Sequence, residues 1–124
     1  MHAISMTRRR FLGSTATVTA FTMLSRQGLG GANDKLNIAG IGVGGMGAAN
    51  LQALESQNIV ALCDVDPDYA AATLKRYPQA RVWTDYREML AKQKDIEAVV
   101  IATPDHTHAV ISAASMRAGK HVYC

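Results

Sequence analysis

A glycine-rich run between an apolar segment and a helical pattern is the feature that most restricts how this chain folds. Gly42-Val43-Gly44-Gly45-Met46-Gly47 directly follows the apolar residues 36–41 and has the spacing G-x-G-x-x-G. Between a strand and a helix, this spacing is typical of a site for a dinucleotide pyrophosphate. Gly42 then permits the tight turn, Gly44 lets the backbone approach the phosphates, and Gly47 lets the helix pack closely. A helix that starts near Gly45 and Met46 would offer its free N–H groups to the phosphates. The alternative, a merely flexible strand-to-helix turn, is disfavoured by this placement.

Short apolar segments alternate with helical patterns along the chain from residue 35 onward, which is typical of βαβ units and a parallel sheet. Ala98-Val99-Val100-Ile101-Ala102 suits a strand covered on both faces, and its β-branched content and Pro104 disfavour the alternative of a buried helix. Right-handed crossovers predict a doubly wound, Rossmann-type α/β fold with strand order 3-2-1-4-5, incomplete at its C-terminal end. We expect strands at 36–41, 59–63, 81–83, 98–102 and from 120 or 121, and helices at 45–55, 67–76, 85–92 and 106–117.

Acidic residues mark the ends of two predicted elements. Asp64 ends the second strand, 22 residues after Gly42, where this fold places a carboxylate that binds the adenosine ribose hydroxyls. A carboxylate there repels a 2′-phosphate, so NAD is favoured over NADP. Asp64 could instead only cap the following helix, but Asp66, which precedes Pro67, is the better candidate for that cap. Asp85 with Glu88 three residues later predicts a capping box.

Polar residues also follow the fourth strand, in the tract Thr103-Pro104-Asp105-His106-Thr107-His108. Ligands of open α/β sheets bind at the carboxyl ends of the strands, so we expect Thr103, Pro104 and His108 to line the cofactor site. Thr103 can offer a hydroxyl, and His108 lies beside the cofactor or caps the last helix. His106 and His108 could bind a metal ion, but no convincing third ligand accompanies them, so we predict no metal site.

The N-terminal residues 1–32 have the composition of an export signal. Arg8-Arg9-Arg10-Phe11-Leu12 precedes a mildly apolar stretch at 13–24 and the small residues Gly30-Gly31-Ala32. The paired arginines indicate a twin-arginine signal peptide, cleaved after Ala32, and hence a periplasmic or otherwise exported protein that meets the export machinery. A basic tail or an amphipathic anchor on a membrane surface is the alternative.

The charge distribution and the cysteines constrain partners further. The chain has net charge +3, but residues 1–32 contain four arginines and no acid, which leaves residues 33–124 with net charge −1. A nucleic-acid partner is therefore not expected. Cys63 and Cys124 end strands that lie about 14 Å apart in the predicted order, too far for a disulfide, so we predict two free, largely buried thiols.

Four tracts together resemble the Gfo/Idh/MocA oxidoreductases: 41–47, 63–66, 103–108 and 118–124. With the leader, the resemblance is to the exported branch of the family. It implies an N-terminal NAD(P)-binding domain, residues 33–124 here, followed by a larger domain that binds a sugar, inositol or related polyol for hydride transfer. Asp105 stands where many members carry asparagine.

The resemblance also implies that this chain is a fragment. Family members continue from a tract like Ala118-Gly119-Lys120-His121-Val122 into Glu-Lys-Pro, whose lysine is the catalytic acid/base, and the chain ends at Cys124. We therefore expect no catalytic residue here, an inactive fragment, and a parent that is an exported, homo-oligomeric oxidoreductase. A redox-neutral NAD-dependent glycosidase of the same family and a non-catalytic nucleotide-binding module are the alternatives.

Overall fold

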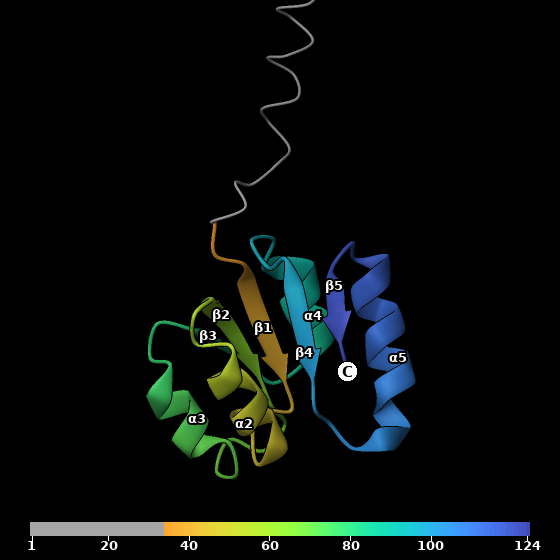
Figure 1. Ribbon diagram of the computed structural model, residues 1–124. Coiled ribbons are helices and arrows are strands. Elements are labelled where there is room, and N and C mark those ends of the chain that lie inside the picture. The colour runs from red at the N-terminus through yellow and green to blue at the C-terminus, as the bar shows by residue number, and fades with distance from the viewer. Residues whose placement is uncertain (1–33) are drawn as a thin grey trace, which may run out of the picture. The chain divides into compact units, whose positions relative to one another are not determined.

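The computed structural model describes residues 34–124, which form a five-stranded parallel sheet with helices on both faces (Figure 1). The leader predicted at 1–32 lies outside the described residues. The strands have the order β3-β2-β1-β4-β5, as the crossover rule predicts. In chain order the elements are β1 (Asn37–Ile41), α2 (Met46–Ala53), β2 (Asn58–Cys63), α3 (Ala71–Arg76), β3 (Arg81–Trp83), α4 (Tyr86–Lys92), β4 (Ala98–Ile101), α5 (Asp105–Arg117) and β5 (His121–Tyr123).

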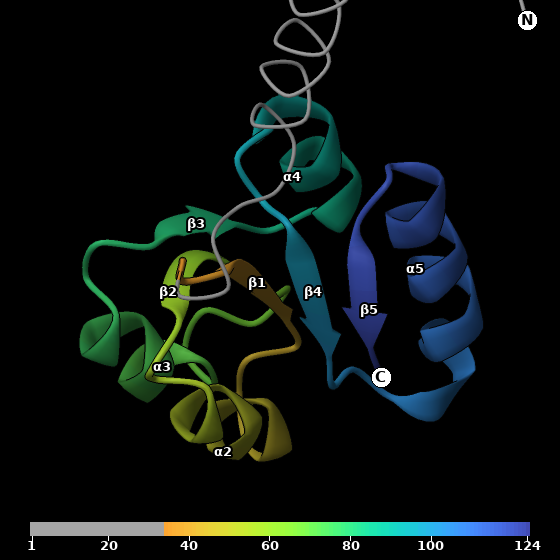
Figure 2. The same ribbon diagram turned by 45° about the horizontal axis from the view of Figure 1, so that its top comes forward.

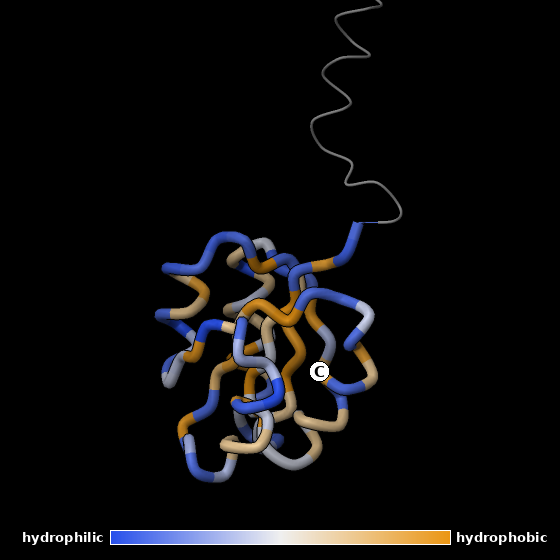
Figure 3. The backbone as a smooth tube through the Cα atoms, turned by 90° about the vertical axis from the view of Figure 1, so that its left-hand side faces the viewer, coloured by the Kyte–Doolittle hydropathy of each residue, from blue (hydrophilic) through white to orange (hydrophobic). Residues whose placement is uncertain are grey.

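The central strands are apolar on both sides because a helical layer covers each face of the sheet. Alternate residues of one strand enter different cores: Ile38 packs with Leu51 of α2, and Ala39 packs with Met89 of α4. Helices α2 and α3 lie in front of the sheet in Figure 1, with α4 behind it, and Figure 2 shows the same layers from another side. In Figure 3 the hydrophobic colouring concentrates along the strands inside the molecule. This burial accounts for the near-continuous apolar strand sequences.

The carboxyl ends of all five strands lie at one end of the sheet, because every strand pair is parallel. β1 pairs with β2 on one side and with β4 on the other, so the connections after β1 and β4 leave the sheet in opposite directions. Such a switch point is where open α/β sheets bind ligands. The segments after β1, β2 and β4 therefore meet at one site.

The second helix pattern begins later than the sequence predicts. The residues 67–70 form turns, and α3 begins only at Ala71. The Asp66 carboxylate accepts hydrogen bonds from the Asp68 and Tyr69 N–H groups, at 3.1 and 3.0 Å. Asp66 therefore caps a turn before the helix, because its side chain competes for the N–H groups that would open the helix.

The predicted capping box is half formed. Asp85 accepts a hydrogen bond from the Arg87 N–H at 2.8 Å, as an N-cap residue does. Glu88 instead bonds Lys92 at 2.7 Å, one helical turn further on. The lysine competes successfully for the glutamate that would otherwise return to the helix start.

The two cysteines are free, as predicted, but only one is buried. Cys63 lies inside the sheet core, whereas Cys124 is exposed. The prediction that both thiols are buried was wrong for Cys124, because it follows the last residue of β5, which is the edge strand of the described sheet. Within residues 34–124, no helix has the length and apolar character needed to cross a membrane.

Candidate functional site: a dinucleotide-binding loop and its surroundings

The turn after β1 requires glycine at position 42. Gly42 has φ +75°, and a Cβ there would lie 2.8 Å from the Thr103 backbone nitrogen. Its N–H donates to the Cys63 carbonyl oxygen at 2.9 Å, so the turn bridges the ends of β1, β2 and β4. The turn is thus held against both neighbouring strands.

Helix α2 starts against this turn, and Gly47 makes the close approach possible. A Cβ on Gly47 would collide with the Gly42 carbonyl oxygen, so no larger residue fits without moving the helix. The Gly47 N–H donates to the Gly44 carbonyl at 3.0 Å. The N-terminus of α2 and its free N–H groups are therefore directed at the carboxyl edge of the sheet.

The Asp64 carboxylate holds the glycine loop in place. Its Oδ2 accepts from the Val43 N–H at 2.8 Å and from the Gly44 N–H at 3.3 Å, and its Oδ1 accepts from the Asp66 N–H at 3.0 Å. A carboxylate has about four acceptor positions, so these three bonds leave it capacity for one more donor. Asp64 thus lies where the sequence predicts, and its ribose contact stays a prediction.

A residue of helix α3 also contacts the glycine loop. The Thr73 hydroxyl donates to the Val43 carbonyl at 2.7 Å, and Thr73 is buried. The loop backbone is therefore fixed from β2 through Asp64 and from α3 through Thr73. Thr73 was not identified from the sequence, because a threonine within a helix has no distinguishing pattern.

The tract after β4 forms the opposite wall. The Thr107 hydroxyl oxygen lies 2.8 Å from the Thr103 hydroxyl oxygen and 2.8 Å from the Pro104 carbonyl oxygen, so the two hydroxyls and the carbonyl form one hydrogen-bonded group beside the cavity. His108 Nε2 lies 2.6 Å from the Thr103 carbonyl oxygen, and since a carbonyl only accepts, the ring N–H donates. His108 therefore fixes the Pro104 turn that opens α5.

Burial changes the acidity of the Cys63 thiol, at the end of β2. Burial, and then the nearby Asp85 and Asp64 charges, raise the pKa of Cys63 to about 12. The thiol is therefore neutral at physiological pH and acts as an apolar side chain in the sheet core.

A cavity of about 470 Å³ lies between these two walls, within the size range of small-molecule and cofactor sites. Gly42, Gly44, Asp64, Thr103 and Pro104 line it, together with Val65, Tyr69 and His106. His108, which the sequence also predicts in this lining, is not part of it, and its ring bonds the Thr103 carbonyl instead. The site fits a dinucleotide, because the glycines of the loop carry no side chains of their own and the Asp64 carboxylate lines the same cavity.

The two histidines of the tract do not form part of a metal cluster in the described residues. His106 is exposed, and the His108 ring nitrogen is used by the Thr103 carbonyl. Within residues 34–124, no three His, Cys, Asp or Glu side chains are grouped so that they could hold a metal ion.

The fold and the loop define a Rossmann-type dinucleotide-binding domain. A family model described as "Oxidoreductase family, NAD-binding Rossmann fold" matches residues 36–124. The chain therefore belongs to the Gfo/Idh/MocA family, whose domain binds NAD.

Relatives of known name include both dehydrogenases and glycoside hydrolases. A glycosyl hydrolase family 109 protein of Stenotrophomonas maltophilia is 32% identical over 97% of this chain and 29% of its own length. Inositol 2-dehydrogenase of Salmonella typhimurium is 32% identical over 68% of this chain and 26% of its own length. The WlbA dehydrogenase of Bordetella pertussis, solved with NADH and UDP-GlcNAcA, is 26% identical with TM-score 0.62, over 71% of this chain and 27% of its own. The chain thus spans less than a third of the length of these relatives.

Proposed function

We propose that this chain is the NAD-binding part of an oxidoreductase that transfers hydride between the cofactor and a sugar, inositol or related polyol. The observation that carries the proposal is the joint placement of the glycine loop, the α2 N-terminus and Asp64 at the switch point of the sheet. NAD supplies the hydride acceptor chemistry when bound. The substrate class is supported by relatives named inositol 2-dehydrogenase and levoglucosan dehydrogenase.

The residues of this chain bind and orient the cofactor in this proposal. The loop amides and the α2 N-terminus hold the pyrophosphate, Asp64 accepts from the adenosine ribose, and the Thr103 hydroxyl faces the cofactor from the opposite wall. A neutral backbone site of this kind holds phosphate without a basic side chain. The negative charge of Asp64 at the ribose end favours NAD over NADP.

The acid/base that moves the substrate proton and the substrate domain belong, in this proposal, to sequence beyond Cys124. The length of the relatives, more than three times that of the matched part, supports this division. The chain alone would then bind NAD without turning over substrate, and the complete protein would be a homo-oligomer.

The test is hydride transfer by the full-length protein. Incubation with NAD and a panel of inositols, aldoses and 1,6-anhydrosugars should raise absorbance at 340 nm with at least one member. A preparation that binds NADH but reduces NAD with none of them would contradict the oxidoreductase proposal and leave the cofactor site standing.

A second candidate is a glycosidase that oxidises its sugar transiently and returns the hydride to it. The alignment with the family 109 glycosyl hydrolase supports this candidate, because it covers 97% of the chain and so extends into residues 1–33. The discriminating assay is release of p-nitrophenol from nitrophenyl glycosides. Release that needs bound NAD but produces no net NADH would favour the glycosidase.

We also propose export through the twin-arginine pathway. Support comes from the Arg8-Arg9 pair and the small residues before Asn33. A folded-protein route suits a domain that must capture NAD in the cytoplasm, where the cofactor is made, and retain it after export.

A further inference from the structure

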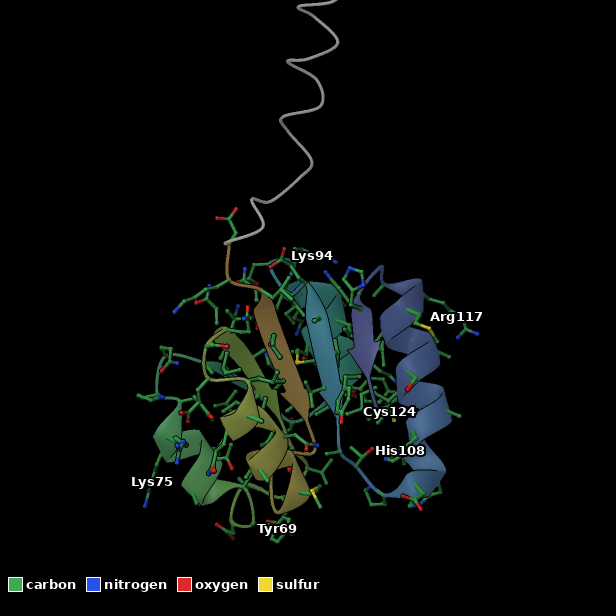
Figure 4. The ribbon with its side chains drawn as sticks, in the orientation of Figure 1. Tyr69, Lys75, Lys94, His108, Arg117 and Cys124 are labelled. Carbon is green, nitrogen blue, oxygen red and sulfur yellow. The ribbon has the colours of Figure 1, made fainter. Side chains whose placement is uncertain are left out.

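The ring of Tyr69 lies on the glycine loop. A Cβ on Gly44 would collide with the Tyr69 ring, and a Cβ on Gly45 would lie 2.5 Å from the Tyr69 hydroxyl oxygen. The ring can rest there only because both positions lack side chains. Tyr69 therefore covers part of the glycine loop from the side of α3. It lies at the carboxyl ends of the strands (Figure 4).

The backbone of Tyr69 is anchored while most of its side chain is open. Its N–H donates to the Asp66 carboxylate at 3.0 Å, yet the residue is 65% exposed. It also lines the cavity that contains Gly42, Gly44 and Asp64. An aromatic ring held at the rim of a ligand cavity, with its surface open, has apolar area and a hydroxyl to offer a ligand.

The cavity needs neutral donors if it is to hold a pyrophosphate. Among the described residues that line it there is no lysine or arginine, and the acidic residues of the lining are Asp64 and Asp66. The donors available are therefore backbone N–H groups, hydroxyls and the His106 ring on the far wall. The Tyr69 hydroxyl stands beside Gly45, one residue before α2 begins, which is the end of the helix that attracts anions.

We propose that Tyr69 is a cofactor-binding residue that donates its hydroxyl hydrogen to the pyrophosphate of NAD while its ring covers the adenosine half. This inference rests on the dinucleotide-binding role of the loop and adds a contact that the G-x-G-x-x-G spacing does not specify. Gly44 and Gly45 then serve two purposes, the approach of phosphate and the seating of this ring.

The test is calorimetric titration of the 124-residue chain and its Tyr69→Phe and Tyr69→Ala variants with ADP-ribose and with adenosine, which lacks the pyrophosphate. Tyr69→Phe should weaken ADP-ribose binding about 3- to 10-fold, as loss of a partly exposed hydrogen bond to a charged group does, and leave adenosine unchanged. Tyr69→Ala should weaken ADP-ribose about 10- to 50-fold and weaken adenosine as well, because the ring is lost too.

Met116→Ala is the matched control, since Met116 is 60% exposed near the C-terminal end of α5 and lines no part of this cavity. Circular dichroism should show the same fold in every variant. Unchanged ADP-ribose affinity in Tyr69→Phe, an equal loss for adenosine, or tighter binding by Tyr69→Ala would each overturn the hydroxyl contact. If the folded wild-type chain binds no ADP-ribose, the dinucleotide role fails and this inference fails with it.

Discussion

At the residue scale, Asp64 combines an observed contact with the glycine loop and a proposed contact with the ribose, whereas the sequence points only to the ribose contact. The motif places it at the ribose end of the site, but its carboxylate also accepts from the Val43 and Gly44 N–H groups. These bonds fix the glycine loop, which we propose receives the phosphates. The acid that we propose to select the cofactor therefore also holds the loop that we propose to bind its phosphates.

Replacing Asp64 separates these functions. Asp64→Ala should weaken NADH binding more than NADPH binding and destabilise the domain by about 1–3 kcal/mol, since the loop N–H groups lose a charged acceptor. Asp64→Asn, which keeps one acceptor oxygen but no charge, should retain more stability and still narrow the preference for NADH. Titration with both cofactors and urea unfolding measure the two effects. An unchanged NADH-to-NADPH ratio in both variants would contradict the ribose assignment.

The thiols give a second residue-scale prediction. In the folded chain at pH 8, iodoacetamide should modify Cys124 and leave Cys63 unmodified, and both should react in urea, because only Cys124 is exposed. Peptide mass spectrometry identifies the modified residue. Rapid modification of Cys63 in the folded chain would contradict its burial.

Cys63 also makes stability depend on pH in a defined direction. Its pKa is raised from 9.0 to about 12 in the folded chain by burial. As pH rises above 9 the unfolded state loses this proton and the folded state keeps it, so the free energy of unfolding should fall between pH 9 and 12. Cys63→Ala should flatten that part of the stability profile measured by urea unfolding. An equal decline in wild type and variant would assign the effect to other groups.

At the scale of elements, the approach of α2 to the turn after β1 decides the shape of the site. Gly47→Ala should cost about 2–4 kcal/mol, because the added methyl meets backbone at Gly42, which cannot rotate away. Gly119→Ala is the matched control: Gly119 has φ +74° but open space around its Cβ position, so only the backbone conformation, about 1 kcal/mol, is strained. Urea unfolding compares the two variants. A Gly47→Ala variant no less stable than Gly119→Ala would contradict the close packing.

The elements differ in how well the sequence predicts them. β3 spans the predicted residues, and β1, β2 and β4 differ by one residue at an end, because apolar runs and turn signals are local information. The start of α3 was mistaken because Asp66 bonds the next N–H groups itself, which depends on a side-chain rotamer.

In the candidate site, too, features that depend on local sequence were predicted and features that depend on tertiary contacts were not. The glycines and Asp64 were found from their spacing, because the turn after β1 and the end of β2 require these residue types at fixed positions. Tyr69 and Thr73 were missed, since their contacts with the loop arise only when the segment after β2 packs against residues 43–45. An aromatic residue five positions after Asp64 was the only local signal for Tyr69.

At the scale of the whole molecule, the charge of the chain is divided between two regions with different proposed roles. Residues 1–32 carry four arginines without an acid, and the remainder carries net charge −1. The basic balance therefore belongs to the proposed export signal, and the proposed phosphate site of the domain has no lysine or arginine in its lining.

Export depends in this account on the arginine pair. Replacing Arg8 and Arg9 together by lysine should abolish appearance of the protein in the periplasm while the cytoplasmic protein still binds NADH. Fractionation and immunoblotting measure the distribution. Continued export of the double variant would contradict the twin-arginine proposal, and an Arg26→Lys variant serves as the control outside the motif.

The central claim, a dinucleotide site built from the glycine loop and Asp64, is tested most directly by titrating the folded 124-residue chain with NADH and NADPH. Calorimetry should show saturable one-to-one binding of NADH and weaker binding of NADPH, because the Asp64 carboxylate repels a 2′-phosphate. A chain with an intact circular dichroism spectrum that binds no NADH, or that binds NADPH more tightly, would contradict the account.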